Sequence, residues 1–176
     1  MEFFEAVDRR YSHKQHFADA PVPWEHLEKI ANAGLKAPNG NNAQCVHLVI
    51  LKDKPAIEPI LDITARNRLE SAPAAIVVFT DSSDQNSVKN FELEDYAAAA
   101  AQMLLAATAL GYVSVWLDSP YFDPVIQDKI RRALGAPETY SMRVVLPIGF
   151  PAEEGARREK KGFWERVSVG TFGAKQ

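Results

Sequence analysis

The chain has 176 residues, of which 47% are hydrophobic and 24% charged, the ordinary mixture of a soluble globular protein. This length suits one domain, residues 1–176, better than two, and it buries a core without help from a disulfide or metal. The formal net charge of −3 argues against a protein that acts mainly on nucleic acid, for which a basic domain is expected.

Three features bear on location. Cys45 is the single cysteine, so no internal disulfide can form, which fits a reducing compartment. The first eight residues carry acids where a signal peptide needs a positive start and an apolar run. The longest apolar run, residues 96–110, is too short and too rich in alanine to span a bilayer well. We therefore expect a cytoplasmic protein.

The first half of the chain predicts helices, a loop and a strand. Phe3, Phe4 and Val7 mark one face of a short opening helix, which runs into a basic segment, residues 9–14. Pro23 suits a first helical position. Residues 37–44 form a loop by composition, residues 46–51 a buried strand, and residues 54–69 a helix. Between Pro23 and the loop, a buried stripe recurs at helical spacing: Trp24, Leu27, Ile30, Ala31 and Leu35.

The second half continues the mixture of strands and helices. Residues 74–79, 113–117 and 143–150 read as strands, and residues 81–90 as an exposed loop. Asp123 and Pro124 form a cap and first turn, followed by an apolar stripe at Val125, Ile126, Ile130 and Leu134. The alternation of strands and helices predicts an α+β or α/β domain.

The helix over residues 92–110 has almost no polar face. A helix that is apolar all round is buried on all sides. In a chain of this size that pattern favours a central helix, shared with a second subunit.

Common catalytic patterns are missing from the sequence. The four histidines form no metal-ligand spacing with Cys45 or a carboxylate, so we expect no metal site. No glycine-rich dinucleotide fingerprint, phosphate loop or nucleophile elbow occurs. Cys45 precedes an expected buried strand, where a cysteine is more often core than nucleophile.

Three polar clusters remain, each with a plain alternative. The basic segment offers guanidinium, ammonium and hydroxyl donors that suit a phosphate, but by itself it is a solvated helix end. The amide loop, residues 39–44, offers donors and acceptors that suit the edge of a heterocycle such as a flavin. The alternative is that its Asn and Gly residues are there only because they tolerate the left-handed backbone of a turn. Residues 157–161 either complete an anion site or are a run of charged residues exposed to solvent.

Taken in order, these clusters resemble the FMN-dependent nitroreductase family. The family's basic-x-Ser-x-basic signature is matched at residues 10–14, and its amide-rich loop at residues 37–45. The long helix ending in glycine and then serine is matched at residues 102–114. The late strand with Gly-x-Pro and following basic residues is matched at residues 149–151 and beyond. Asn39 stands where the family usually has Ser, and Cys45 where it usually has Pro.

The resemblance implies a fold and a site. The fold is an α+β three-layer sandwich, with a central mixed or antiparallel sheet flanked by helices, in an intertwined homodimer with FMN at the interface. Arg10, Ser12 and Lys14 are implied to hold phosphate, ribityl and pyrimidine groups, with Arg9 and His13 as bystanders. The other residues implied to bind the cofactor are Tyr11 within the same signature, Arg158 and Lys160 in the phosphate clamp, Asn39, Gly40, Asn42 and Gln44 from the other subunit's loop, Leu117, Asp118 and Ser119 near the reactive edge, and Asn67 on the pyrimidine side.

The activity implied by the resemblance is a two-step reduction. NAD(P)H passes a hydride to N5 of FMN, and a small acceptor such as a nitroaromatic or a quinone then takes the electrons; no catalytic side chain is required. One alternative is a flavin-binding or sensing protein without turnover. Another is a family variant that acts as a dehalogenase, an enoate reductase or a flavin-degrading enzyme.

Overall fold

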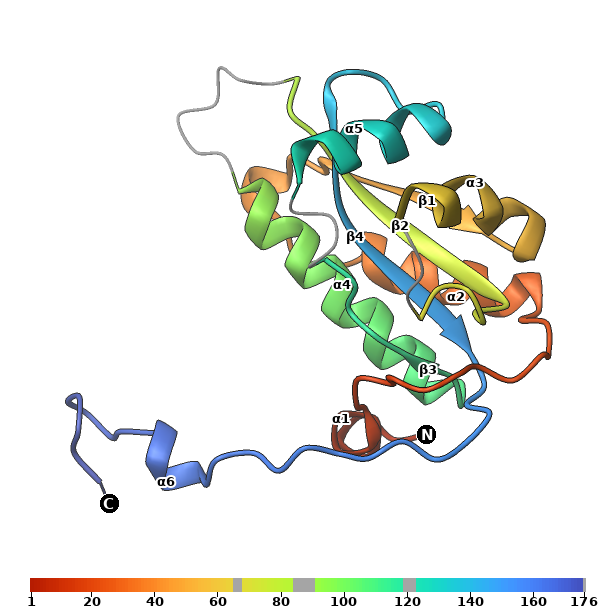
Figure 1. Ribbon diagram of the computed structural model, residues 1–176. Helices are drawn as coiled ribbons and strands as arrows, with labels where there is room; N and C mark the ends of the chain where they lie inside the picture. The colour runs from red at the N-terminus through yellow and green to blue at the C-terminus, as the bar shows by residue number, and fades with distance from the viewer. Residues whose placement is uncertain (65–67, 84–90, 119–122, 176) are drawn as a thin grey trace.

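The computed structural model describes residues 1–64, 68–83, 91–118 and 123–175 (Figure 1). Helices and strands are interspersed along the chain, as the sequence predicts. Their bounds are α1 Phe3–Arg9, α2 Trp24–Leu35, the 3₁₀ turn η1 Gly40–Asn42, β1 Val46–Leu51, α3 Lys54–Thr64, β2 Ala74–Asp81, α4 Glu92–Ala109, β3 Val113–Ser114, α5 Pro124–Ala133, β4 Tyr140–Gly149 and α6 Phe163–Arg166.

The four strands form one antiparallel sheet in the order β1-β2-β4-β3. Val46 of β1 pairs with Thr80 of β2, and Ala74 of β2 pairs with Ile148 of β4. The N-terminal chain adds a short parallel bridge, from Ser12 to Ser114, at the β3 edge. The predicted α+β class and antiparallel sheet are confirmed.

Helices cover both faces of the sheet, which makes three layers (Figure 1). Side chains alternate across a strand, and β2 uses both faces. Ile76 and Val78 pack with residues of α2 and α4. Val77 and Phe79 pack with residues of α3 and α5 on the other side. All four are fully buried, so the core is divided by the sheet into two apolar layers.

The helix predicted to be buried on all sides is α4, and in the isolated chain that prediction is wrong. Ala99, Ala100 and Met103 are buried, but Leu93 is 61% exposed and Ala101 is exposed. α4 packs on the sheet, on α2 and on α1, while Leu93 and Ala101 lie on the part of its surface that stays exposed. The helix therefore presents an apolar surface to solvent.

Other departures have the same cause, since ends and edges have fewer neighbours than the middle of a layer. Trp24 and Leu35, at the two ends of α2, are 53% and 55% exposed instead of continuing the buried stripe. Val125 at the start of α5 is 59% exposed. The predicted buried strand Val46–Leu51 has the right bounds, but it is the edge strand β1 and is only partly buried.

The opening helix α1 has its predicted position, and its covered side is the one that carries the buried Ala6 and contacts α4, not the side that carries the two phenylalanines. Phe3 and Phe4 are 63% and 78% exposed, and they contact each other edge to face.

Within the described part of the chain, none of the helices combines the length and apolar character that crossing a bilayer requires.

Candidate functional site

The basic segment continues from the end of α1 and lies along the sheet edge. Arg10 is the C-cap of α1, Ser12 bridges Ser114, and the His13 N–H donates to the Ser114 carbonyl at 3.0 Å. Because side chains alternate along extended chain, His13 points into the protein while Ser12 and Lys14 are exposed. The strand-like geometry therefore presents Ser12 and Lys14 on one side.

His13 is completely buried and holds the basic segment in place. Its Nε2 lies 3.1 Å from the His16 carbonyl, and its Nδ1 lies 3.3 Å from the Tyr11 hydroxyl. A carbonyl only accepts, so Nε2 carries the proton and, in the neutral ring, Nδ1 accepts from Tyr11. Phe17 contacts the ring edge to face, with 5.0 Å between centroids. The sequence predicted His13 to be a bystander, and nothing in it marks His13 as buried, because Ser12, His13 and Lys14 are all polar.

The cations of the basic segment differ in whether they have a partner. Arg9 forms an ion pair with Glu5, at 3.1 Å between Nη1 and Oε1. Among the described residues, by contrast, nothing forms a hydrogen bond or ion pair with the side chains of Arg10, Ser12 or Lys14. This set of free donors fits a phosphate and its neighbouring hydroxyl or carbonyl groups, because ionised donors make the stronger hydrogen bonds.

The C-terminal arm, residues 150–175, begins beside the basic segment. Phe17 bridges Pro151, and the Ala152 N–H donates to the His16 carbonyl at 3.0 Å. Arg157 donates to the Asp8 carbonyl at 3.0 Å, and its guanidinium carbon lies 5.7 Å from the centre of the Tyr11 ring. These contacts border a hollow of about 360 Å³.

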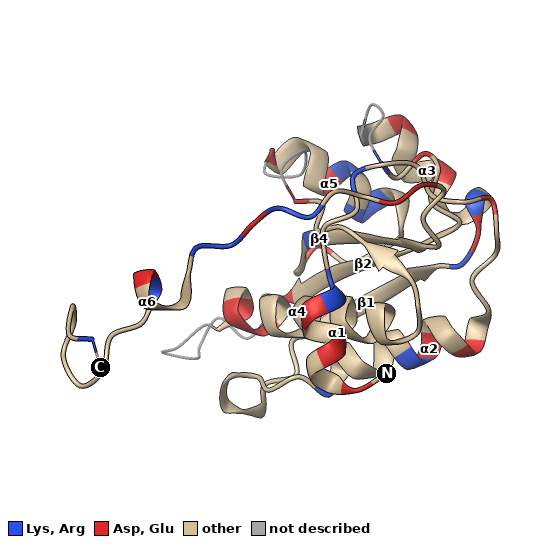
Figure 2. Cartoon of the chain, turned by 90° about the horizontal axis from the view of Figure 1, so that it is seen from below, with Lys and Arg blue, Asp and Glu red and all other residues tan. Residues whose placement is uncertain are grey.

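Beyond Arg157, the arm leaves the body of the molecule (Figures 1 and 2). Arg158 and Lys160 are exposed, and their side chains form no bond to any residue that the structure describes. In this stretch Glu159 stands between two pairs of basic residues, and Figure 2 shows the arm with a red segment between blue ones. The structure thus brings the base of the arm, and Arg157 in particular, to the basic segment. The two predicted clamp residues lie farther along the same arm.

The segment after β3 holds the residues implied to lie near a flavin's reactive edge. Leu117 is buried, and its N–H donates to the Val145 carbonyl at 3.1 Å, so that N–H is already used. Asp118 accepts a hydrogen bond from the Trp116 indole at 2.8 Å. Ser119 and Asn67, the remaining residues of the implied set, lie outside the described residues.

The amide loop is held in an unusual backbone conformation. Asn41, Asn42 and Gln44 have positive φ angles of 54°, 54° and 51°, in the left-handed region that asparagine tolerates better than most residues. The Asn39 carboxamide oxygen accepts from the Gln44 N–H at 3.0 Å. Asn39 therefore serves the turn itself, whereas the side chains of Asn42 and Gln44 are exposed.

Gly40 lies tightly against Phe91. A Cβ atom built at this position would lie 2.2 Å from the Phe91 ring, closer than any side chain tolerates. The Gly40 N–H donates to the Asp95 carboxylate at 2.7 Å. The loop is thus fitted against the first turn of α4, and it borders a polar hollow of about 380 Å³ together with Asp95 and Tyr140.

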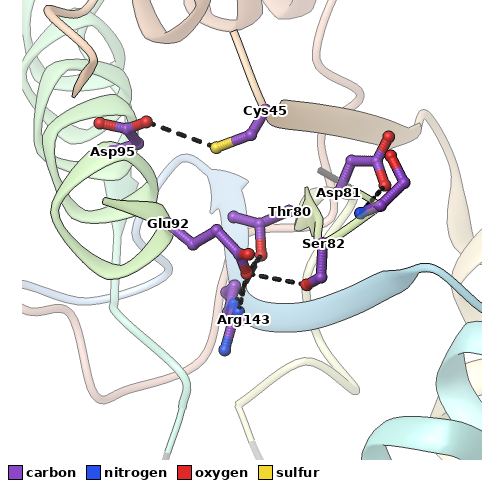
Figure 3. Close-up of polar contacts among 8 residues, drawn as sticks. Cys45, Thr80, Asp81, Ser82, Glu92, Asp95 and Arg143 are labelled. Carbon is purple, nitrogen blue, oxygen red and sulfur yellow. Dashed lines mark hydrogen bonds and ion pairs between the residues drawn. The ribbon is translucent and has the colours of Figure 1, made fainter. Parts of the chain in front are cut away.

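A buried ion pair fixes this end of α4 to the sheet (Figure 3). The Glu92 carboxylate accepts from Arg143 at 2.5 Å, from the Ser82 hydroxyl at 2.9 Å and from the Thr80 hydroxyl at 3.1 Å. Arg143 also donates to Thr80 at 2.7 Å. The network joins α4 to β2 and β4, so the wall behind the amide loop is rigid.

Cys45 follows the amide loop and is expected to react slowly. Burial, with Asp95 and Glu92 nearby, raises the pKa of the Cys45 thiol from 9.0 to about 11. At pH 8 this lowers the thiolate fraction roughly a hundredfold, and the greater nucleophilicity of a more basic thiolate recovers part of the rate. Alkylation by iodoacetamide should therefore be about tenfold slower in native protein than in urea-unfolded protein at the same pH. Equal rates would show that the thiol is not held in this environment.

The basic segment and the amide loop lie at opposite ends of α4. Gly40 contacts the first turn of α4, whereas Tyr11 shares its hollow with Thr108 and Tyr112 at the last turn and beyond. Eighteen helical residues separate these ends by about 25 Å, at 1.5 Å per residue. Within one chain the two clusters therefore do not form a single compact site.

The comparisons with known proteins agree over most of the chain. The family model described as "Nitroreductase family" matches residues 7–81 and 64–150. A protein of Methanothermobacter thermautotrophicus, provisionally named NADH dehydrogenase/NAD(P)H nitroreductase, is 31% identical over 90% of this chain and 82% of its own length.

Solved structures share the fold. A nitroreductase family protein from Clostridium difficile 630 is 29% identical, with a TM-score of 0.80 over 97% of this chain and 99% of its own. A nitroreductase from Bacteroides fragilis NCTC 9343, crystallised with bound FMN, is 23% identical, with a TM-score of 0.75 over the whole of both chains. At that identity the likeness shows the fold alone. The match of the family model and the relative at 31% identity together establish that the chain belongs to the nitroreductase family.

Proposed function

We propose that this protein is an FMN-dependent oxidoreductase that uses NAD(P)H to reduce a small acceptor such as a nitroaromatic or a quinone. Family membership supports the reaction class, and relatives carry nitroreductase and NADH dehydrogenase names. FMN, when bound, supplies N5 as the atom that receives and returns the hydride. The chain's own residues bind the cofactor and set its electrostatics. The proposal treats residues 1–176 as one domain of a cytoplasmic protein.

The observation that carries the proposal is the set of free donors on the basic segment. Arg10 and Lys14 are cations without a partner among the described residues, although Arg9 beside them has one. Arg10 and Ser12 are proposed to bind the phosphate and ribityl groups. Lys14 then places positive charge near the pyrimidine, which favours the anionic reduced cofactor. Arg158 and Lys160, on the arm that begins beside this segment, are proposed to complete the phosphate clamp.

The proposed cofactor site is shared by two subunits of a homodimer. The amide loop lies about 25 Å from the basic segment along α4, so a second copy must supply the loop if both contact one FMN. Asn42 and Gln44 are exposed and available for that contact. Two further features support association: the uncovered apolar side of α4, and Phe163, Trp164 and Phe172 on the arm, which are 65%, 42% and 105% exposed.

Anaerobic mixing of the FMN-loaded protein with NADH or with NADPH tests the reaction. We expect at least one donor to bleach the visible absorbance of the bound flavin, and a quinone to restore it. If the protein binds FMN but neither donor bleaches it, the alternative of a flavin-binding or sensing protein without turnover is favoured.

A further inference from the structure

We propose that Asp95 is the positioning residue that holds the amide loop in its cofactor-binding conformation. This inference rests on the proposed function, because it concerns the loop that the partner subunit's site is proposed to use. Asp95 is 4% exposed and lies in the first turn of α4. It is outside the motifs that identify the family in the sequence.

The Asp95 carboxylate holds the loop at two points. Its Oδ1 accepts from the Gly40 N–H at 2.7 Å. Its Oδ2 accepts from the Cys45 thiol at 3.4 Å (Figure 3). Gly40 begins the 3₁₀ turn, and Cys45 follows the last residue of the loop. One side chain therefore spans the segment that contains Asn42 and Gln44.

The loop needs such a support because its backbone is otherwise unfavourable. Asn41, Asn42 and Gln44 all adopt the left-handed region, which persists in non-glycine residues when surrounding contacts enforce it. Contacts within the loop are few: the Asn39 side chain accepts from the Gln44 N–H, and the Ala43 N–H donates to the Gly40 carbonyl. These bonds close the turn on itself but do not orient it relative to α4.

The surroundings allow a buried carboxylate in this position. Asp95 lies near the N-terminus of α4, where the helix dipole stabilises negative charge. The raised pKa of Cys45 keeps its thiol protonated, so the thiol remains a donor to Asp95 at neutral pH. One turn earlier, Glu92 ties the helix to Arg143, so Asp95 projects from a fixed base. The sheet therefore fixes the position of α4, and Asp95 on α4 fixes the orientation of the loop.

The experiment compares FMN binding to full-length Asp95→Ala, Asp95→Asn and wild-type protein by flavin fluorescence titration. We expect Asp95→Ala to raise the Kd about tenfold, the effect of losing a charge-assisted bond. Asp95→Asn keeps an oxygen that accepts from the Gly40 N–H, so its Kd should lie between those of wild type and Asp95→Ala. Glu94→Ala is the matched control: this exposed carboxylate belongs to the same helical turn, and its loss should leave the Kd within twofold of wild type.

A double-mutant cycle separates positioning from general destabilisation. If Asp95 acts through the loop, adding Asp95→Ala to Asn42→Ala should weaken binding little further. The inference would be overturned if the losses of FMN binding free energy in the two single variants add fully in the double variant. A Kd within twofold of wild type for Asp95→Ala would also overturn it. Should Asp95→Ala fail to fold, the same cycle with Asp95→Asn decides. Wild-type protein that binds no FMN would instead overturn the proposed function, which makes the two failures distinguishable.

Discussion

Replacing Arg10 with alanine is expected to raise the Kd for FMN about tenfold to a hundredfold. Arg10 is half-buried, and its guanidinium has no partner among the described residues. A hydrogen bond to an ionised group contributes about 1.5–3 kcal/mol, and each 1.4 kcal/mol is about tenfold in affinity. Fluorescence titration of FMN into the variant measures this change.

Arg9→Ala is the matched control for that result. Arg9 is adjacent in sequence and carries the same charge, but it is exposed and is paired with Glu5. An exposed pair of this spacing is worth a few tenths of a kcal/mol, so binding and folding should change little. Equal losses for the two variants would mean that the overall positive charge, and not the placement of Arg10, holds the phosphate.

Arg143→Met is expected to lower the free energy of unfolding by about 3 kcal/mol. The substitution removes the cation that Arg143 supplies to the Glu92 carboxylate, whose side chain is only 9% exposed. Breaking a buried ion pair from one side costs about 3–5 kcal/mol. The hydroxyls of Thr80 and Ser82 still donate to Glu92, which places the loss at the lower end of that range. Urea unfolding at pH 7 provides the measurement.

An exposed pair elsewhere provides the comparison for Arg143. Arg132 binds Asp128 at 2.8 Å, but its side chain is 71% exposed, so Arg132→Met should cost at most about 1 kcal/mol. Adding Glu92→Gln to Arg143→Met should recover part of the lost stability, because the buried charge that Arg143 no longer compensates is then removed. If the double variant is no more stable than Arg143→Met alone, burial of the carboxylate is not the cause.

Local signals predicted most of the secondary structure. The strand Val46–Leu51 and the long helix α4 lie where composition and periodicity place them. Asp123 caps α5 by accepting from the Val125 N–H at 2.8 Å, as its position before Pro124 indicates. These features depend on neighbouring residues in the chain, so a single sequence suffices to find them.

Burial was harder to predict because it depends on which neighbours each residue meets. Trp24 fits the helical stripe of α2, yet the sheet does not extend far enough to cover it. Leu93 belongs to an apolar helix, yet it is 61% exposed. Hydrophobic periodicity gives the direction of a side chain and not the extent of the surface that it faces.

The candidate site was predicted in its parts but not in its arrangement. The basic segment and the amide loop were identified by composition, and both are accessible in the structure. Their separation along α4 follows from tertiary structure, which no spacing reveals. The contacts that support them also join distant residues: Gly40 to Asp95, 55 positions apart, and Arg143 to Glu92, 51 positions apart. Such pairings become visible only when the sheet order is known.

The most direct test of a shared FMN site is a mixed dimer of one Arg10→Ala subunit and one Asn42→Ala subunit, isolated with two different affinity tags. If the basic segment and the amide loop come from different subunits, one site carries both defects and the other carries neither. We predict that the mixed dimer binds one FMN with wild-type affinity, while the wild-type dimer binds two and each variant homodimer binds weakly at both sites. A mixed dimer with no tight site, beside a wild-type dimer that binds two FMN molecules, would place each site within one subunit and contradict the account.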